Sequence, residues 1–368
     1  MATPQAIDVA AELQRRYGGA PVPVSRAGID EFSYAQIRAA LRLGLLTRIR
    51  RGVLAPAAAD PAETYLLVAR SAEEDEAAAQ ALARRARALL RPLPPETRIS
   101  HESAAILRRL WLPCLPDGDL HVTIPGQSER RDGGIHIHGT SAAAEVEYVE
   151  GLPVVTLPRA AVDVARGHLA TAAVVPLDHA ARMLIARAAG DSTPPWEAAH
   201  DPALREAVHD PALRAGALAE LHRAWQASFG WPGTRVVREL LADVEPASES
   251  PYESISRIQL ADRHLPAPLV GVRVEGASGR TYWADFLWPA ARLIGEADGD
   301  TKYGTTARSR EQALESQRRR QADLEAAGYA VTRWRPGDAW DTVAARIRQH
   351  LDARLTPTAV ASRGQRRR

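Results

Sequence analysis

Residues 281–302 read TYWADFLWPAARLIGEADGDTK, and this stretch determines how we interpret the rest of the chain. Residues 282–288 are apolar and aromatic, which is typical of a buried strand. Pro289-Ala290 interrupts the run, and a second strand-like run follows at residues 292–298. The stretch therefore predicts a β-hairpin closed by the two-residue turn Pro289-Ala290.

The predicted hairpin gathers carboxylates on one of its faces. Because strand side chains alternate with a period of two, a two-residue turn pairs Asp285 with Ile294. Glu296 is then a diagonal neighbour of Asp285 on the same face, about 7–8 Å away. Asp298 shares that face two residues later. A four-residue turn keeps this parity and a three-residue turn does not.

Carboxylates that point the same way repel one another unless positive charge lies between them. A hard divalent cation such as Mg²⁺ binds one or two carboxylates and keeps water or phosphate oxygens. This arrangement suits phosphodiester hydrolysis, in which the metal polarises the phosphate and activates water. The alternative is an acidic, solvated turn, since Glu-Ala-Asp-Gly-Asp is also favourable turn composition.

The acid pattern resembles a known nuclease family. Asp285, then Glu296-x-Asp298-Gly299, then GYAVTRW at residues 328–334 is similar to the very-short-patch-repair-type nuclease domains of the PD-(D/E)XK restriction-endonuclease superfamily. The resemblance covers about residues 250–354. It implies a mixed β-sheet flanked by helices, with Asp285 and Glu296 binding Mg²⁺ or Mn²⁺.

One position departs from the superfamily pattern. The usual Lys, two residues after the second acid, is Asp298 here, so Asp298 is expected only to assist. Lys302, the only Lys in the chain, is a candidate replacement, because a Lys can lose its proton when buried and an Arg does not. In this superfamily an acid on the first helix also approaches the metal, which makes Glu253 a candidate. Ser250-Pro251-Tyr252-Glu253 is equally a helix-capping box.

A polar helix is predicted at residues 305–327. It carries Arg318, Arg319 and Arg320, whose guanidinium groups could hold the phosphates of a nucleic acid, although a solvated helix face has the same composition. Residues 300–368 hold 15 Lys or Arg against 8 Asp or Glu, whereas the whole chain has a net charge of only +2. The basic tail, residues 356–368, is predicted to be disordered.

The composition excludes some classes of protein. Cys114 is the single cysteine, so no intramolecular disulfide can form, which favours a reducing compartment. We find neither a signal-peptide pattern nor an apolar run of 18 residues, and therefore expect a cytoplasmic protein without a membrane partner.

The N-terminal segment, residues 1–58, has the pattern of a winged helix-turn-helix. A helix is predicted at residues 6–17, a short one at 21–27, and a third at 33–43 that begins with a Ser33–Gln36 capping box. A basic hairpin follows, in which we expect Arg48, Arg50 and Arg51 to contact DNA phosphates. This segment resembles the N-terminal domain of AbiEi-type antitoxins; a protein-interaction winged helix is the alternative.

Residues 59–190 also resemble the body of AbiEi antitoxins, through SHESAA from Ser100, GLPV from Gly151 and the Leu-Asp-x-Ala that begins at Leu177. Ser100 is predicted to cap a helix, which accounts for His101 and Glu102 better than acid–base chemistry does. His136-x-His138 places two imidazoles on one strand face, a possible metal pair without an evident third ligand.

These observations predict an α/β (α+β) protein of several domains. After the winged helix and the antitoxin-like body, residues 191–249 form a helical linker and residues 250–355 a nuclease-like domain. The expected function is Mg²⁺-dependent endonuclease activity on DNA, linked to toxin–antitoxin or phage-defence systems. The alternative is a DNA-binding antitoxin or transcriptional regulator with an inactive nuclease-like domain. A toxin or a second copy of the chain is a possible partner.

Overall fold

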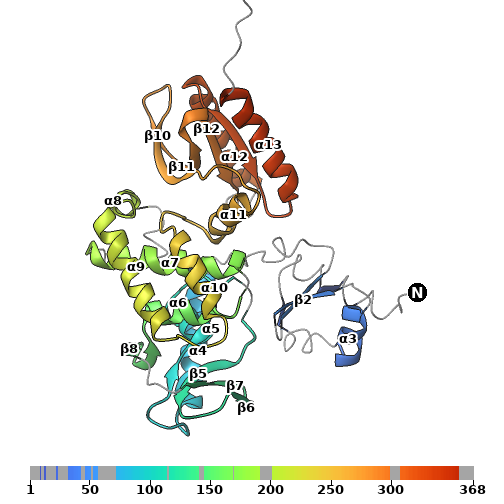
Figure 1. Ribbon diagram of the computed structural model, residues 1–368, viewed down its shortest axis with the longest axis vertical. Coiled ribbons are helices and arrows are strands. Elements are labelled where there is room, and N and C mark those ends of the chain that lie inside the picture. Colours follow the sequence, from blue (N-terminus) through green and yellow to red (C-terminus); the bar gives the residue numbers. More distant parts are fainter. Residues whose placement is uncertain are drawn as a thin grey trace, which may run out of the picture. The chain divides into compact units, whose positions relative to one another are not determined.

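The described residues form a mixed α/β fold with three β-sheets (Figure 1). The structure, a computed structural model, describes residues 9, 12–13, 22–23, 32–42, 46–50, 53–56, 72–113, 116–140, 145–168, 170–190, 201–298 and 307–355. The chain divides into two compact units, Met1–Ile258 and Gln259–Arg368. No helix among the described residues is long and apolar enough to cross a membrane.

The N-terminal segment contains a three-stranded antiparallel sheet of order β1-β3-β2. Its elements are β1 (Val22–Pro23), α3 (Tyr34–Arg42), β2 (Leu46–Arg50) and β3 (Val53–Pro56). The capping box at α3 is confirmed, because Ser33 N donates to Gln36 Oε1 at 2.8 Å and Gln36 N donates to Ser33 Oγ at 3.3 Å. The short helix predicted at residues 21–27 is wrong at Val22 and Pro23, since these residues pair with β3.

A buried apolar cluster joins these N-terminal elements. It consists of Val9, Leu13, Ile37, Ala40, Leu46 and Leu54. The predicted winged helix-turn-helix stays a prediction, because of its three predicted helices only the third, α3, is described along most of its length. The predicted helix at residues 6–17 lies outside the described residues except at positions 9, 12 and 13.

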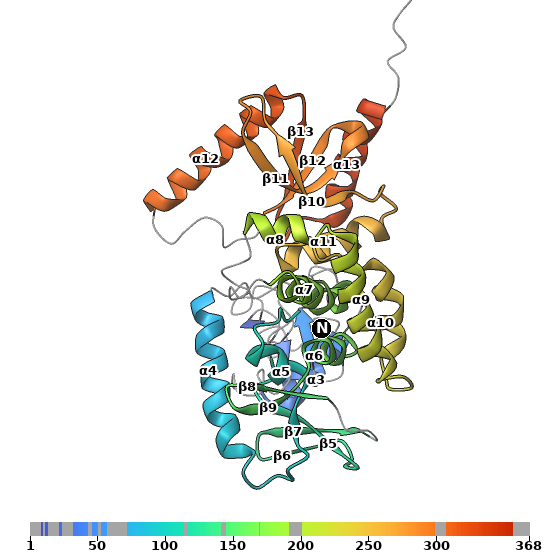
Figure 2. The same ribbon diagram turned by 90° about the vertical axis from the view of Figure 1, so that its left-hand side faces the viewer.

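The second sheet has six strands in the order β6-β7-β5-β4-β9-β8. Strands β5 and β7 are parallel, as are β4 and β9, while the remaining pairs are antiparallel. Helix α5 packs on β5 of this sheet, and α6 packs in turn on α5 (Figure 2). The elements are α4 (Ala72–Leu89), β4 (Arg98–Ile99), α5 (His101–Leu107), β5 (Leu120–Pro125), β6 (Arg130–Asp132), β7 (Ile135–Thr140), β8 (Val146–Val149), β9 (Leu152–Val155) and α6 (Leu157–Ala165).

The segment predicted to be a helical linker instead packs on this body. Helices α8 (Pro202–Ala207), α9 (Pro211–Gln226) and α10 (Thr234–Leu240) contact α7 (Ala170–Ala188), and α9 and α10 also contact α6. The repeated sequence begins two helices as predicted: Asp201 Oδ1 accepts the Ala203 N–H, and Asp210 Oδ1 accepts those of Ala212 and Leu213. Residues 191–200 lie outside the described residues.

Helix α7 carries a buried imidazole that is neutral in the folded protein. The His179 ring stacks on Trp111 at 3.9 Å between centroids, and its Nδ1 accepts the Trp111 N–H at 3.0 Å. Burial is the largest cause that lowers the pKa of His179 from 6.5 to about 3, and Arg182 lowers it further. Because the unfolded chain takes up this proton more readily, His179 gives its full stability above about pH 6.5 and loses it as the pH falls toward 3.

We expect His179→Asn to flatten the pH dependence of stability in acid. The Asn Oδ1 can take the place of Nδ1 as acceptor, but it does not titrate. Between pH 6.5 and 4.5 the wild type should lose about 2–3 kcal/mol more of its unfolding free energy than the variant, at about 1.4 kcal/mol per pH unit. Urea unfolding at several pH values, followed by circular dichroism, measures this difference; parallel curves would contradict the assignment.

The C-terminal unit contains a four-stranded sheet of order β10-β11-β12-β13, antiparallel except for the parallel pair β12–β13. Helices α12 and α13 lie on opposite sides of it (Figure 2). The elements are α11 (Pro251–Asp262), which spans the boundary between units, β10 (Leu269–Glu275), β11 (Thr281–Trp288), β12 (Leu293–Ala297), α12 (Ala307–Ala326), β13 (Ala330–Trp334) and α13 (Trp340–Leu355). This agrees with the predicted mixed sheet flanked by helices.

The turn of the central hairpin is longer than predicted. A 3₁₀ turn at Pro289–Ala291 is followed by Arg292 with φ of 45°, so Trp288 pairs with Leu293. The predicted pairing of Asp285 with Ile294 is therefore wrong.

Gly295 precedes Glu296 on β12 and therefore faces the opposite side of the sheet, where Trp334 and Trp288 pack over it. A Cβ there would lie 2.7 Å from the Trp334 ring and 3.1 Å from the Trp288 ring. Glycine thus allows both indoles to pack directly against β12, beside Glu296.

Candidate functional site

The carboxylates predicted from the sequence lie where β11 and β12 stop pairing. The ladder ends at Phe286 and Gly295. Beyond it the Asp285 side chain, rather than a backbone carbonyl, accepts the Ala297 N–H at 2.9 Å. Asp285 is thereby fixed beside the residue that follows Glu296, so the structure brings these two predicted residues to the same end of the hairpin.

Glu296 is buried and held by two arginines from elements distant in sequence. Its Oε1 lies 2.7 Å from Arg320 of α12, and its Oε2 lies 2.9 Å from Arg333 of β13. Arg333 is opposite Glu296 in the parallel β12–β13 register. Both carboxylate oxygens therefore have a cationic partner.

Asp298 extends the same network. Its Oδ2 lies 3.3 Å from Arg333 Nη1 and accepts from Gln317 Nε2 at 3.1 Å. Arg333 thus bridges two buried carboxylates, while its Nε and Nη2 are buried without a hydrogen-bond partner among the described residues. With Asp285 the set contains three carboxylates and two guanidinium groups, which leaves one net negative charge.

The three arginines predicted to hold phosphate differ in their environment. Arg320 is half-buried, stacks on Tyr282 at 5.7 Å and donates to the Trp283 carbonyl as well as to Glu296. Arg319 is exposed and pairs with Glu315 one turn earlier at 2.9 Å, and Arg318 is exposed. Of this triplet, Arg320 is the one that the structure brings to the carboxylates.

Glu253 forms the predicted capping box of α11. Its Oε2 accepts the Glu249 N–H at 2.7 Å, its Oε1 accepts from Ser250 Oγ at 2.8 Å, and Ser250 Oγ accepts the Glu253 N–H at 3.2 Å. Capping therefore accounts for the burial of this carboxylate at 3 % exposure.

We expect Glu253→Gln to leave divalent-metal binding unchanged, because Gln retains the capping box. Glu253→Ala should instead lower the unfolding free energy by about 1 kcal/mol through loss of the cap. Titration calorimetry with Mn²⁺ in the presence of uncleavable DNA measures the first effect, and urea unfolding measures the second. A weakened Mn²⁺ affinity in a folded Glu253→Gln variant would assign Glu253 to the metal site.

Several predicted site residues lie outside the described part of the chain. Lys302 and Arg51 are not described, and for Arg48 and Arg50 only the backbone, in β2, is described. Their roles stay predictions.

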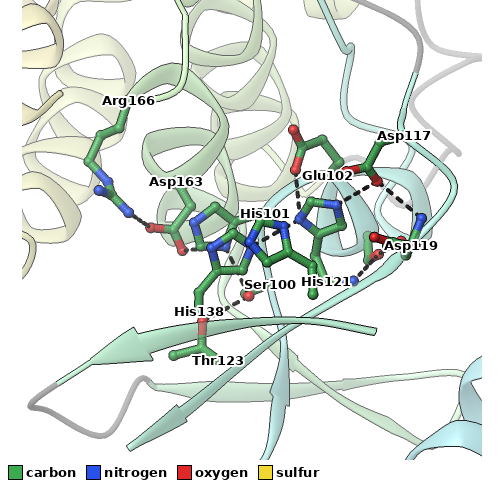
Figure 3. Close-up of polar contacts among 12 residues, drawn as sticks. Ser100, His101, Glu102, Asp117, Asp119, His121, Thr123, His138, Asp163 and Arg166 are labelled. Carbon is green, nitrogen blue, oxygen red and sulfur yellow. Dashed lines mark hydrogen bonds and ion pairs between the residues drawn. The ribbon is translucent and has the colours of Figure 1, made fainter. Parts of the chain in front are cut away.

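Ser100 occupies the predicted N-cap position of α5, but the predicted capping by its side chain is wrong. Helix α5 begins at His101, whose φ is 50°, and Ser100 makes no side-chain cap. Instead, the Ser100 Oγ accepts from Thr123 Oγ1 at 2.8 Å and lies 3.0 Å from His101 Nδ1 (Figure 3). Asp163 also approaches His101 Nδ1, at 4.0 Å. Because both neighbours face the same ring nitrogen, these residues do not form a nucleophilic Ser-His-Asp triad.

A cluster of imidazoles adjoins His101. The His138 ring stacks on His101 at 3.5 Å between centroids, and His138 Nε2 lies 2.9 Å from His121 Nδ1. In the part of the chain that the structure describes, His121, His136 and His138 form the one set of three possible metal ligands whose ligand atoms all lie within 4.8 Å of one another. The sequence pattern predicts the pair His136 and His138 on β7 but gives no sign of His121 as the third residue.

The charges in this cluster are uneven. Burial is the main cause that lowers the pKa of His138 to about 2, and burial also lowers the pKa of His136. Burial opposes a charge on His121 too, but Glu102 and Asp117 raise its pKa above the ordinary value. These carboxylates lie 3.0 Å from His121 Nδ1 and 2.9 Å from its Nε2.

Comparison with known proteins gives no function. No family model matches the chain. Two curated proteins of Mycobacterium tuberculosis are similar to it: "Uncharacterized protein MT2308" of strain CDC 1551 / Oshkosh and "Uncharacterized protein Rv2248" of strain ATCC 25618 / H37Rv. Each is 29% identical over 143 residues, which cover 37% of this chain and 49% of the relative. The chain thus spans about half the length of the curated relatives it matches.

Proposed function

We propose that the C-terminal unit is a Mg²⁺- or Mn²⁺-dependent endonuclease that hydrolyses phosphodiester bonds in DNA. The observations that carry the proposal are that Asp285 accepts the N–H of Ala297, the residue between Glu296 and Asp298, and that Arg333 bridges Glu296 and Asp298 at the open end of the β11–β12 ladder. The mixed sheet with α12 inserted before β13 is the architecture that the nuclease resemblance implies. The relatives' printed names give no activity.

The donor set fits a hard divalent cation, which prefers carboxylate oxygens. Arg320 and Arg333 now neutralise Glu296, so a cation must replace part of their charge. A phosphate diester offers those guanidinium groups an alternative acceptor of matching geometry. Metal and DNA are therefore expected to bind together: the arginines turn to the phosphate oxygens, and Asp285 and Glu296 become available to the ion.

Each side chain then has a distinct task in hydrolysis. Asp285 and Glu296 would hold the cation, which would supply Lewis-acid stabilisation of the phosphate. Asp298 keeps Arg333 oriented. Arg320 and Arg333 stabilise the negative charge that develops on the phosphate. Lys302, four residues beyond Asp298, is the candidate group for activating water.

We propose that the N-terminal segment binds DNA and thereby brings the nuclease unit to its substrate. Its sheet order suits a winged helix, and the β2–β3 hairpin carries Arg48 and Arg50 on a strand, with Arg51 following. Such contacts to phosphates give affinity that decreases with salt rather than sequence selectivity. The proposed setting is a cytoplasmic toxin–antitoxin or phage-defence system, with a toxin or a second copy of the chain as partner.

The test is cleavage of supercoiled plasmid DNA by the purified full-length chain. We expect nicked and linear products with Mg²⁺ or Mn²⁺ and intact plasmid when EDTA is added. Intact plasmid with both metals, under conditions in which the protein binds the DNA, would refute the nuclease and leave the second candidate.

That second candidate is a DNA-binding antitoxin or transcriptional regulator whose nuclease-like unit is inactive. Two observations favour it: both Glu296 oxygens already have arginine partners, and Asp298 stands where the superfamily has a Lys. It predicts DNA binding by the N-terminal segment without Mg²⁺ binding at Asp285 and Glu296. Calorimetry with Mg²⁺ in the presence of uncleavable DNA separates the two candidates.

A further inference from the structure

The histidine cluster of the six-stranded sheet is formed by the parallel pairing of β5 and β7. The register places His121 opposite His136 and Thr123 opposite His138. Opposed residues of neighbouring strands point to the same face, so the three imidazoles converge from two strands. His121 and His136 are 3 % and 8 % exposed. The ring centroids of His136 and His138 are 4.0 Å apart.

Two of these histidines are oriented from behind by carboxylates. His121 Nε2 lies 2.9 Å from Asp117 Oδ1, and Arg131 in turn holds Asp117 Oδ2 at 2.7 Å. His136 Nε2 lies 3.2 Å from Glu129 Oε1. A carboxylate on the outer ring nitrogen fixes the tautomer and leaves the inner nitrogen as a lone-pair donor, which is how metal-binding histidines are generally supported.

The ring nitrogens that face the centre of the cluster are His121 Nδ1, His136 Nδ1 and His138 Nε2. Without an ion, their hydrogen-bonding needs are not met. His136 Nδ1 is buried and has no hydrogen-bond partner among the described residues. His121 Nδ1 can carry at most one hydrogen, yet it faces both His138 Nε2 at 2.9 Å and Glu102 Oε2 at 3.0 Å. A buried polar atom without a partner costs about 1–3 kcal/mol, and such atoms often mark a missing water or ion.

We propose that His121, His136 and His138 bind one zinc-class divalent ion. Three imidazole nitrogens suit zinc and its first-row neighbours, whereas Mg²⁺ prefers oxygen ligands. Two nitrogens on a tetrahedral zinc ion lie roughly 3.3 Å apart, so ligand atoms that lie within 4.8 Å of one another would close by up to about 1.5 Å on binding the ion. Glu102 Oε2 lies 3.0 Å from His121 Nδ1, the nitrogen that would bind the ion, and would complete the shell. The ion then links β5 and β7 to α5, and the burial of its ligands makes it a structural centre.

This site is independent of the proposed nuclease. Its residues belong to the unit Met1–Ile258, and Asp285 and Glu296 belong to Gln259–Arg368. The two sites also select different metals. A protein with the double substitution Asp285→Asn and Glu296→Gln should therefore retain the zinc site, and this variant is the background for the experiment.

The experiment measures zinc in the untagged full-length chain after removal of metal with EDTA and titration with Zn²⁺. We expect about one tightly bound zinc per chain by elemental mass spectrometry, and a higher thermal unfolding midpoint when zinc is present. His136→Phe should lower zinc affinity at least 100-fold. This substitution retains a ring and leaves only the exposed Glu129 without its histidine. His222→Gln, on an exposed histidine of α9, is the control and should bind zinc as the wild type does.

The outer carboxylate gives a second test that keeps all three ligands. Asp117→Asn should weaken zinc binding about 10–100-fold, because outer partners of metal ligands have effects of this size. Absence of tight zinc in the double-substituted background, or zinc affinity unchanged in both His136→Phe and Asp117→Asn, would overturn the site. If His136→Phe fails to fold, the Asp117→Asn affinity and the zinc-induced rise of the wild-type midpoint decide the question.

Discussion

Asp285→Asn is expected to reduce metal-dependent DNA cleavage by about 10²–10³-fold or more, the largest change we foresee for a single substitution. The Asn Oδ1 can still accept the Ala297 N–H that Asp285 accepts at 2.9 Å, so the hairpin end keeps its shape. The substitution removes one negative charge from the set of three carboxylates and two guanidinium groups, whose net charge is −1. Without it, the remaining Glu296 and Asp298 are balanced by Arg320 and Arg333, and little attraction for a cation remains.

Plasmid cleavage with Mg²⁺ and with Mn²⁺ measures this effect, and Glu296→Gln should match it. Asp323→Asn is the matched control in the same unit, since Asp323 accepts from Ser278 and Tyr282 and serves the β10–β11 turn. Cleavage should survive in Asp323→Asn even where stability falls. If Asp285→Asn and Glu296→Gln both cut DNA at the wild-type rate, the carboxylates are not the metal site.

The hairpin around Asp285 could be predicted from the sequence, but its turn length could not be predicted from composition alone. Two-residue hairpin turns need positive φ at their first position or at both, and proline is locked near −65°. Pro289 therefore excludes the predicted turn, and Arg292 at φ of 45° supplies the positive value instead. The fixed φ of Pro289 follows from the sequence alone, and it favours the four-residue turn that the structure has.

The sequence around Glu296 does not predict which residues pair with its carboxylate. Arg320 and Arg333 lie 24 and 37 residues further along the chain, and they meet Glu296 only because α12 crosses back to bring β13 beside β12. Arg320 was expected to contact phosphate, and Arg333 had no expected role. A carboxylate pattern indicates where charge gathers, but the sheet order determines what neutralises it.

The zinc-class site illustrates the same limit for histidines. His136-x-His138 has a visible period of two, and residues 121–123, His-Val-Thr, have the same period on another strand. Although β6 lies between β5 and β7 in the sequence, β5 and β7 are neighbours in the sheet, and only their parallel pairing brings His121 to the pair. A helix cap at Ser100 was the better local explanation of His101 and Glu102, yet the His101 ring stacks on His138 and Glu102 faces His121.

Arg333→Met is expected to lower stability without metal and to strengthen the response to metal, two effects of opposite sign. Arg333 Nη1 lies 2.9 Å from Glu296 and 3.3 Å from Asp298, and both carboxylates are buried. Removing one partner of a buried ion pair leaves an uncompensated charge and costs about 3–5 kcal/mol. A divalent cation can replace that positive charge, so Mg²⁺ should recover part of the loss.

Urea unfolding with and without Mg²⁺ measures both effects. Arg354→Met is the control, because Arg354 donates to the carbonyls of Ala291 and Gly328 in the same unit. Mg²⁺ should stabilise Arg333→Met clearly more than it stabilises the wild type or Arg354→Met. An equal response in all three proteins would mean that the cation does not bind at Glu296. The arginine bridge would then be permanent, and the inactive nuclease-like unit would become the better description.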